Sequence, residues 1–141
     1  MSVTGLEVFD RTTQSSVIWV DDVMRDLNWD DRHKAYRALR SVLHALRDRL
    51  PVNDAAHLAA QLPMLIRGLF FEGWQPAKVP IRGRNEKFFL AQIGDDFLFE
   101  AETDPRQIAT AVFGVIERHI TGGQVDQIKR VLPRGIQELW P

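Results

Sequence analysis

The sequence contains no cysteine, and it has no long apolar run. The first absence excludes disulfide cross-links, cysteine-based zinc sites and thiol nucleophiles. The second excludes a membrane-spanning helix, which needs about 20 consecutive apolar residues. The N-terminal stretch MSVTGLEVFDRTT also lacks the basic region and apolar core of a secretory signal. These absences predict a soluble, cytoplasmic protein with no membrane partner.

Net charge is also nearly absent, at −1 for the 141 residues. A chain so balanced has no bulk attraction for nucleic acid or for anionic lipid. Its hydrophobic content of 45% and charged content of 26% are typical of a globular protein. The length suits one domain with a sizeable core. We therefore expect residues 1–141 to form a single domain.

Recognisable catalytic motifs are missing as well. The sequence has neither a P-loop nor a dinucleotide-binding glycine pattern. His33 and His44 would stand about 16 Å apart on one helix, too far to share a metal ion. We therefore predict no catalytic residues, no metal and no cofactor, and we expect that the protein is not an enzyme. An enzymatic role would need Asp21, Asp22 or Asp26 to meet a histidine in a cleft.

An internal repeat is the first positive feature. Sliding the chain against itself by 70 residues aligns apolar positions along nearly its whole length. The aligned pairs include Trp19 with Phe89, Val42 with Val112, Leu46 with Ile116, Leu62 with Leu132 and Pro63 with Pro133. This register predicts a tandem duplication, with one repeat at about 1–71 and the other at about 72–141. Residues 73–85, rich in glycine and proline, are predicted to form the linker.

Each repeat is predicted to contain about four helices. In the first repeat these cover about 13–27, capped by Thr12 or Thr13; a stretch from Asp30 or Asp31 to Pro51; a short helix capped by Asn53 or Asp54; and a helix with Pro63 in its first turn. In the second repeat, Asp104 is predicted to cap a helix that opens with Pro105. Residues 88–101 have an alternative interpretation as a small β-hairpin turning at Gly94. The repeat register favours a helix there.

A basic stripe crosses the second predicted helix. Its members are Arg37, Arg40, His44 and Arg47, at spacings of three, four and three residues, opposite the apolar stripe. Such a stripe could bind phosphates of nucleic acid or another anionic ligand. Alternatively it pairs with the first helix, because residues 1–31 hold seven acids and only two arginines, or it simply faces water. Trp74 is a further candidate binding residue, since it could line a cleft between the repeats or simply close the core.

Several short motifs together resemble a known family. They are LRDRLP (46–51), AAQLP (59–63), EGW (72–74) and the run GG…LP…LWP (122–141), with TTQSSVIWV (12–20) near the start. The chain is similar in these elements to the DUF2267 family of bacterial proteins, whereas GDDFLFEA (94–101) departs from its pattern. The resemblance implies an all-α orthogonal bundle. It implies no activity, because the family is one of unknown function.

Two functional hypotheses remain. The first is a non-enzymatic helical module that acts through contacts with a protein partner or with itself, as a homodimer. Apolar residues off the main stripes, such as Ile18, Phe71 and Trp74, would supply its interface. The alternative is nucleic-acid or anionic-ligand binding through the basic stripe of Arg37, Arg40, His44 and Arg47.

Overall fold

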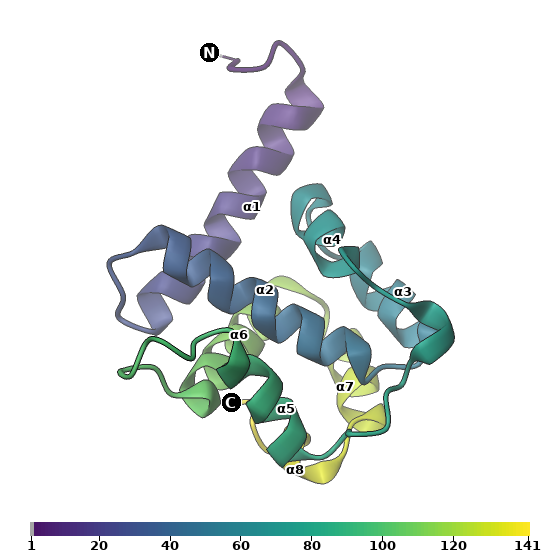
Figure 1. Ribbon diagram of the computed structural model, residues 1–141. Helices are drawn as coiled ribbons and strands as arrows, with labels where there is room; N and C mark the ends of the chain where they lie inside the picture. The colour runs from purple at the N-terminus through teal and green to yellow at the C-terminus, as the bar shows by residue number, and fades with distance from the viewer. Residues whose placement is uncertain (1) are drawn as a thin grey trace.

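The computed structural model describes residues 2–141, which form helices and no strands (Figure 1). The α-helices are α1 (Glu7–Asp26), α2 (Arg32–Asp48), α3 (Val52–Ala60), α4 (Met64–Phe71), α5 (Glu86–Asp95), α6 (Pro105–His119), α7 (Gly122–Val131) and α8 (Arg134–Gln137), with a 3₁₀ turn, η1, at Pro76–Lys78. The predicted all-α class is confirmed. No helix within residues 2–141 is long and apolar enough to cross a membrane.

The hairpin alternative for residues 88–101 is wrong. Helix α5 covers most of that segment, and the side chain of Asn85 caps it by accepting a hydrogen bond from the backbone N–H of Phe88. Phe89 and Ile93, four residues apart, are both buried on the inner face of this helix. This spacing outweighs the turn signal at Gly94, which lies in the last turn of the helix.

One hydrophobic core serves the whole bundle, with α2 near its centre. Helix α2 packs against α1, α4, α5 and α6. Leu43 and Leu46 of α2 lie fully buried in the same cluster as Phe113 and Ile116 of α6. Both halves of the chain therefore contribute to the same core.

Helix starts were predicted with mixed success. Asp31 caps α2, and Asp104 caps α6 ahead of Pro105, as predicted. The prediction that α1 begins after Thr12 or Thr13 is wrong, because the helix already begins at Glu7. The carboxylate of Asp10 accepts hydrogen bonds from the backbone N–H and the hydroxyl of Thr4, which hold the preceding residues against this first turn.

Three prolines stand at helix N-caps. Pro63 precedes α4 with φ −55° and ψ 150°, and Pro133 precedes α8 with φ −56° and ψ 150°. Both lie one residue before the predicted first-turn position. Pro51 caps α3 in the same conformation, where Asn53 or Asp54 had been predicted. An N-cap adopts extended angles that proline favours, and its missing N–H is not needed there.

Helices of the two halves recur 70 positions apart. Val52 begins α3 and Gly122 begins α7, while Met64 begins α4 and Arg134 begins α8. The correspondence extends to side-chain contacts at the ends of α2 and α6, the helices that end in Asp48 and His119.

The ring of His119 stacks on Trp19 at 4.9 Å between centroids, and its Nε2 atom lies 2.6 Å from Asp22. At the matching positions, the guanidinium of Arg49 lies 5.3 Å from the centre of Phe89, and its Nη1 donates to Gln92 over 2.7 Å. Arg49, Phe89 and Gln92 are each 70 positions away from His119, Trp19 and Asp22, respectively. The contacts run crosswise, since the end of α6 meets α1 and the end of α2 meets α5. They support our proposal that the halves arose by duplication.

Candidate functional site

The basic stripe on α2 is engaged within the molecule. Arg37 forms an ion pair with Glu100 at 2.6 Å and donates to the backbone carbonyl of Asp96 at 2.8 Å. Arg40 donates to Glu72 through Nε at 2.9 Å and through Nη2 at 2.5 Å. This charged hydrogen bond lowers the pKa of Glu72.

The other two members cap the C-terminal end of α4. His44 donates from Nε2 to the carbonyl of Leu69 at 2.7 Å, and Arg47 donates to Phe70 at 2.8 Å and to the carbonyl of Glu72. The last carbonyls of a helix lack intrahelical partners and carry partial negative charge. Burial lowers the pKa of His44, and the nearby charge of Arg47 lowers it further.

The interpretation that this stripe pairs with the acidic first helix is wrong, because the acids of that helix have other partners. On α1, Asp21 pairs with Arg32, Asp22 with Arg25 and His119, and Asp26 with Arg118. The stripe faces α4 and the end of α5 instead. A phosphate group would have to compete with Glu72, Glu100 and several backbone carbonyls for these cations, which weighs against nucleic-acid binding here.

Arg49 is the largest fully buried side chain in residues 2–141, at 1% exposure. It donates to the carbonyls of Ala45 at 2.8 Å and Gly83 at 3.1 Å, besides its bond to Gln92. Burial lowers its pKa to about 10, so it stays charged at neutral pH. The sequence interpretation missed this residue. Its alignment with His119 was the available signal.

Trp74 lies at the edge of the core. Its ring packs on Phe71 at 5.0 Å between centroids, and both side chains contact the buried cluster. Gly73 precedes it with φ +75°, a backbone angle that glycine adopts readily and that turns the chain after α4. The structure therefore places Trp74 as a closing side chain of the core.

Asp22 and His119 do converge, as an enzymatic role would require. Burial raises the pKa of Asp22, but hydrogen bonds from His119 and Arg25 outweigh it and hold the pKa below its ordinary value. No serine or threonine hydroxyl within residues 2–141 hydrogen-bonds His119, so no nucleophile and base are paired there. The same residues contain no group of three or more potential metal ligands.

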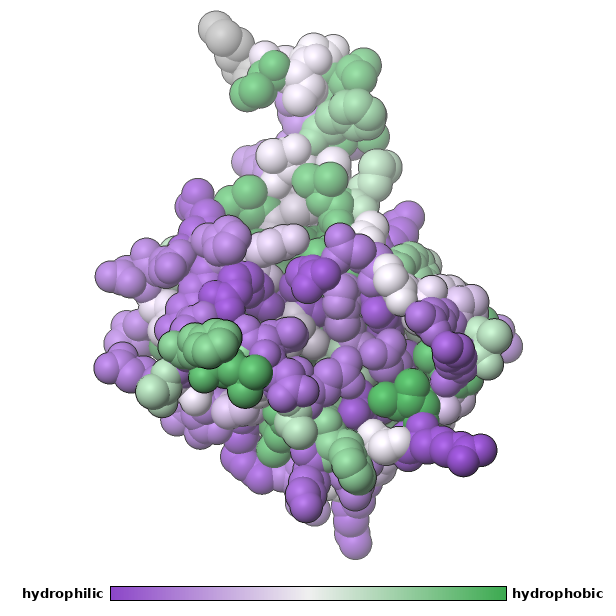
Figure 2. Space-filling view, in the orientation of Figure 1, coloured by the Kyte–Doolittle hydropathy of each residue, from purple (hydrophilic) through white to green (hydrophobic). Residues whose placement is uncertain are grey.

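The N-terminal half of α1 projects away from the bundle and carries exposed apolar side chains (Figures 1 and 2). Leu6 is 51% exposed, Phe9 48% and Val17 36%. With the exposed Thr13 and with Val20, which is only 9% exposed, they follow one another at steps of three and four residues, so they share one side of the helix. We call these five residues the apolar face.

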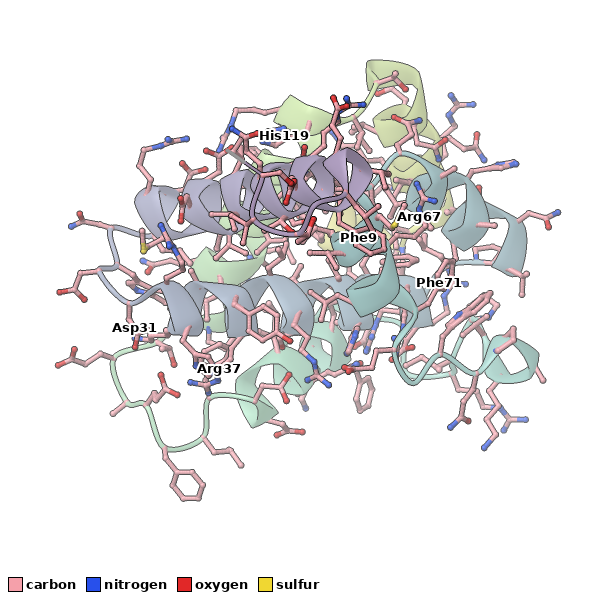
Figure 3. The ribbon with its side chains drawn as sticks, turned by 90° about the horizontal axis from the view of Figure 1, so that it is seen from above. Phe9, Asp31, Arg37, Arg67, Phe71 and His119 are labelled. Atoms are coloured by element: carbon pink, nitrogen blue, oxygen red, sulfur yellow. The ribbon has the colours of Figure 1, made fainter. Side chains whose placement is uncertain are left out.

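Two grooves flank α1. The apolar groove, of about 550 Å³, lies between α1, α2 and α4 and is lined chiefly by Val17, Val20, Leu65, Ile66 and Leu69. The polar groove, of about 500 Å³, lies on the other side of α1; its lining includes Arg11, Ile18, Trp19, Gln61, Arg67 and His119. Figure 3 shows Phe9 and His119 on opposite sides of α1, which separates the two grooves. Of the predicted interface residues, Ile18 lines the polar groove.

Comparison with known families gives one result. A family model described as "Uncharacterized conserved protein (DUF2267)" matches residues 17–139. No curated protein matches the chain. The motifs that suggested the resemblance have structural roles here: Leu46 and Leu50 fill the core, Arg49 joins α2 to α5, and Glu72 pairs with Arg40. The projecting half of α1 lies largely outside the matched stretch.

Proposed function

Because the chain belongs to the DUF2267 family, whose description names no activity, we propose a function from its surface: a protein-interaction module that self-associates through α1 and α4. The observation that carries this proposal is the apolar face, which continues along α1 into the apolar groove. Exposed contiguous apolar surface of this kind marks interaction sites in proteins that otherwise have polar surfaces.

The spacing of the apolar face favours a second copy of the same chain as the partner. An antiparallel pair of α1 helices related by a two-fold axis at Thr13 sets Phe9 of each copy opposite Val17 of the other. The same axis sets Leu6 opposite Val20. Every member of the face then meets another member, as an isologous interface requires.

The shape of the molecule supports the same pairing. One chain carries both a projecting apolar helix end and an apolar groove beside it, so two copies can exchange these features. Phe9 of one copy would lie among Val17, Leu65 and Leu69 of the other. A helical segment of only about ten residues is marginal in water by itself. Burial of the projecting half against a partner would stabilise it.

Cysteine cross-linking tests the arrangement, because the natural chain has no cysteine. Thr13→Cys should form a disulfide-linked dimer rapidly under mild oxidation, since only a residue on the axis faces its own copy. Gln14→Cys is the matched control, because position 14 points away from the apolar face. Equal cross-linking of both variants, or of neither, would contradict the proposed register.

Sedimentation velocity tests the association itself. Wild-type protein should sediment as a dimer at micromolar concentration, and Phe9→Glu should sediment as a monomer, because it places a charge among the apolar side chains of the interface. Phe99→Glu is the control, since Phe99 is fully exposed in the connection between α5 and α6. A wild-type monomer under these conditions would end the proposal.

A further inference from the structure

The polar groove has a counterpart in the second half of the molecule, and there the chain itself fills it. Three residues lining the groove are Ile18, Gln61 and His119. The residues 70 positions from them are Phe88, Val131 and Arg49. Each counterpart contacts at least one of two linker residues: Phe88 lies beside Gly83, Val131 accepts from Arg84, and Arg49 contacts both.

Those contacts are specific. The carbonyl of Gly83 accepts a hydrogen bond from Arg49 at 3.1 Å. Gly83 also passes so close to Phe88 that an added Cβ would lie 3.2 Å from the ring. Arg84 donates to the carbonyl of Val131 at 2.7 Å and to that of Arg49 at 3.4 Å. The linker thus lies across the space between α5, the α7–α8 turn and the end of α2.

The walls of the two sites correspond as well. In the first half, Arg67 donates to the carbonyl of Leu62 at 3.1 Å. In the second, Gln137 donates to the carbonyl of Leu132 at 2.8 Å, and both residues of this bond are 70 positions further on. The two turns that precede α4 and α8 are therefore held by equivalent hydrogen bonds, and one wall of each site has the same construction.

The first half lacks the segment that would close its site. The counterparts of linker residues 77–85 are residues 7–15, and these are helical, belonging to the projecting half of α1. Their backbone runs outward along the helix and does not fold across His119. The space that Gly83 and Arg84 occupy in the second half is consequently open in the first, as the polar groove.

One difference in charge determines which ligand suits the open site. Arg67 stands where the filled site has the neutral Gln137, and Arg11 and His119 also line the groove. No aspartate or glutamate is among the lining residues. Arg67 already donates from Nε and Nη2 to the carbonyls of Ala59, Ala60 and Leu62, whereas no hydrogen bond within residues 2–141 uses its Nη1 atom. An acidic side chain beside Arg67 would form a charge-assisted hydrogen bond with that atom.

We propose that the polar groove binds an extended peptide segment of a partner protein, with glycine passing beside Ile18 followed by an acidic residue facing Arg67. His119 hydrogen-bonds the peptide backbone through Nδ1, the ring nitrogen that its contact with Asp22 leaves free. This site is on the side of α1 away from the apolar face. It depends on the correspondence between the halves and is independent of self-association.

Two synthetic peptides and an NMR titration of the full chain test the proposal. One peptide copies linker residues 79–85, VPIRGRN, and the other carries Glu in place of the second arginine, VPIRGEN. The acidic peptide should shift the backbone amide signals of Ile18, Gln61, Arg67 and His119. It should bind about tenfold more tightly than the basic peptide, because a charge-assisted hydrogen bond forms only with glutamate.

Two variants identify the site and the source of the preference. Arg67→Gln should abolish the preference for the acidic peptide, and Ile18→Glu should abolish its binding. Phe99→Glu, which adds the same charge far from the groove, should bind normally. The proposal is overturned if the acidic peptide causes no shifts in the groove, if the basic peptide binds equally well, or if Ile18→Glu binds as the wild type does.

Discussion

The two halves of the chain share a frame and differ in helix length. Helix α1 has 20 residues where α5 has 10, and α4 has 8 residues where α8 has 4. The two longer helices of the first half, α1 and α4, lie side by side and together line both the apolar and the polar groove. The core is therefore common to both halves, whereas the apolar and polar grooves lie along the longer helices of the first half.

The second half uses the corresponding stretch of chain differently. Its linker lies against the bundle, where the N–H of Ile81 donates to the carbonyl of Asp48 at 2.9 Å and Arg84 joins the ends of α2 and α7. That segment closes the second half over Arg49. Substitutions at matching positions should therefore have different effects in the first half, whose groove is open, and in the second half, which the linker covers.

The largest effects should come from the shared core, where the halves should behave alike. Leu46→Ala and Ile116→Ala each remove a fully buried side chain at matching positions. Each should lower the free energy of unfolding by about 2–5 kcal/mol. Chemical denaturation followed by circular dichroism should show one transition in both variants. Separate unfolding transitions for the two halves would contradict a core shared by both.

The next effect should separate the closed half from the open one. Arg49→Met leaves the carbonyls of Ala45 and Gly83 and the amide oxygen of Gln92 without their buried donor. We expect a loss of about 2–3 kcal/mol, the upper part of the range of about 1–3 kcal/mol for leaving buried polar groups without a partner. His119→Met, at the matching position beside the open groove, should cost about 1 kcal/mol or less, because water can reach Asp22. Equal losses in denaturation experiments would contradict this contrast.

Smaller effects are expected at the two matching prolines. Pro63→Ala and Pro133→Ala should each change the free energy of unfolding by less than about 1 kcal/mol, because an N-cap proline mainly restricts the unfolded chain. Both prolines have nearly the same backbone angles, so the two variants should also agree with each other. Thermal denaturation of both variants measures these changes in stability. A large loss of stability in only one variant would show that the two bends are not equivalent.

The smallest effect should be a pH dependence confined to the first half, since Gly114 occupies the position that matches His44. Burial lowers the pKa of His44 in the folded state below its ordinary value of 6.5. Above pH 6.5 the imidazole is neutral in both states, and stability is complete. As the pH falls below 6.5 the unfolded state takes up the proton first, so stability declines until the folded pKa is reached.

His44→Gln tests this dependence. The variant should lose less stability than the wild type when urea denaturation at pH 7 is compared with denaturation at pH 5.5. An identical decline in both proteins would assign the pH dependence to other groups.

Local signals in the sequence predicted much of the fold. The apolar spacing of α2, its cap at Asp31 and its end before Pro51 depend on neighbouring residues, and these were identified correctly. The start of α1 was missed because Thr12 and Thr13 resemble caps, whereas the bonds from Thr4 to Asp10 extend the helix to Glu7. A cap pattern cannot show that the chain before it continues as a helix.

The candidate sites were less predictable, because their partners are distant in sequence. The stripe of Arg37 and Arg40 was recognised, but its contacts with Glu100 and Glu72 depend on where α4 and α5 end in space. Arg49 attracted no interpretation, since arginine is seldom buried. The two grooves arise from the unequal lengths of α1 and α5, which the repeat alignment by itself does not reveal.

The crosswise packing of α2 on α5 and of α6 on α1 also bears on ancestry. On our proposal that the halves arose by duplication, a single-copy precursor of about 70 residues, with only its own four helices, would have left the end of its second helix uncovered. It could have buried that end against the first helix of another copy, as a symmetric pair of chains. Joining two such genes would have made the encounter intramolecular and raised the effective concentration of each half for the other. The linker would then be the newest part of the protein, free to acquire the glycine and arginine that now close one half.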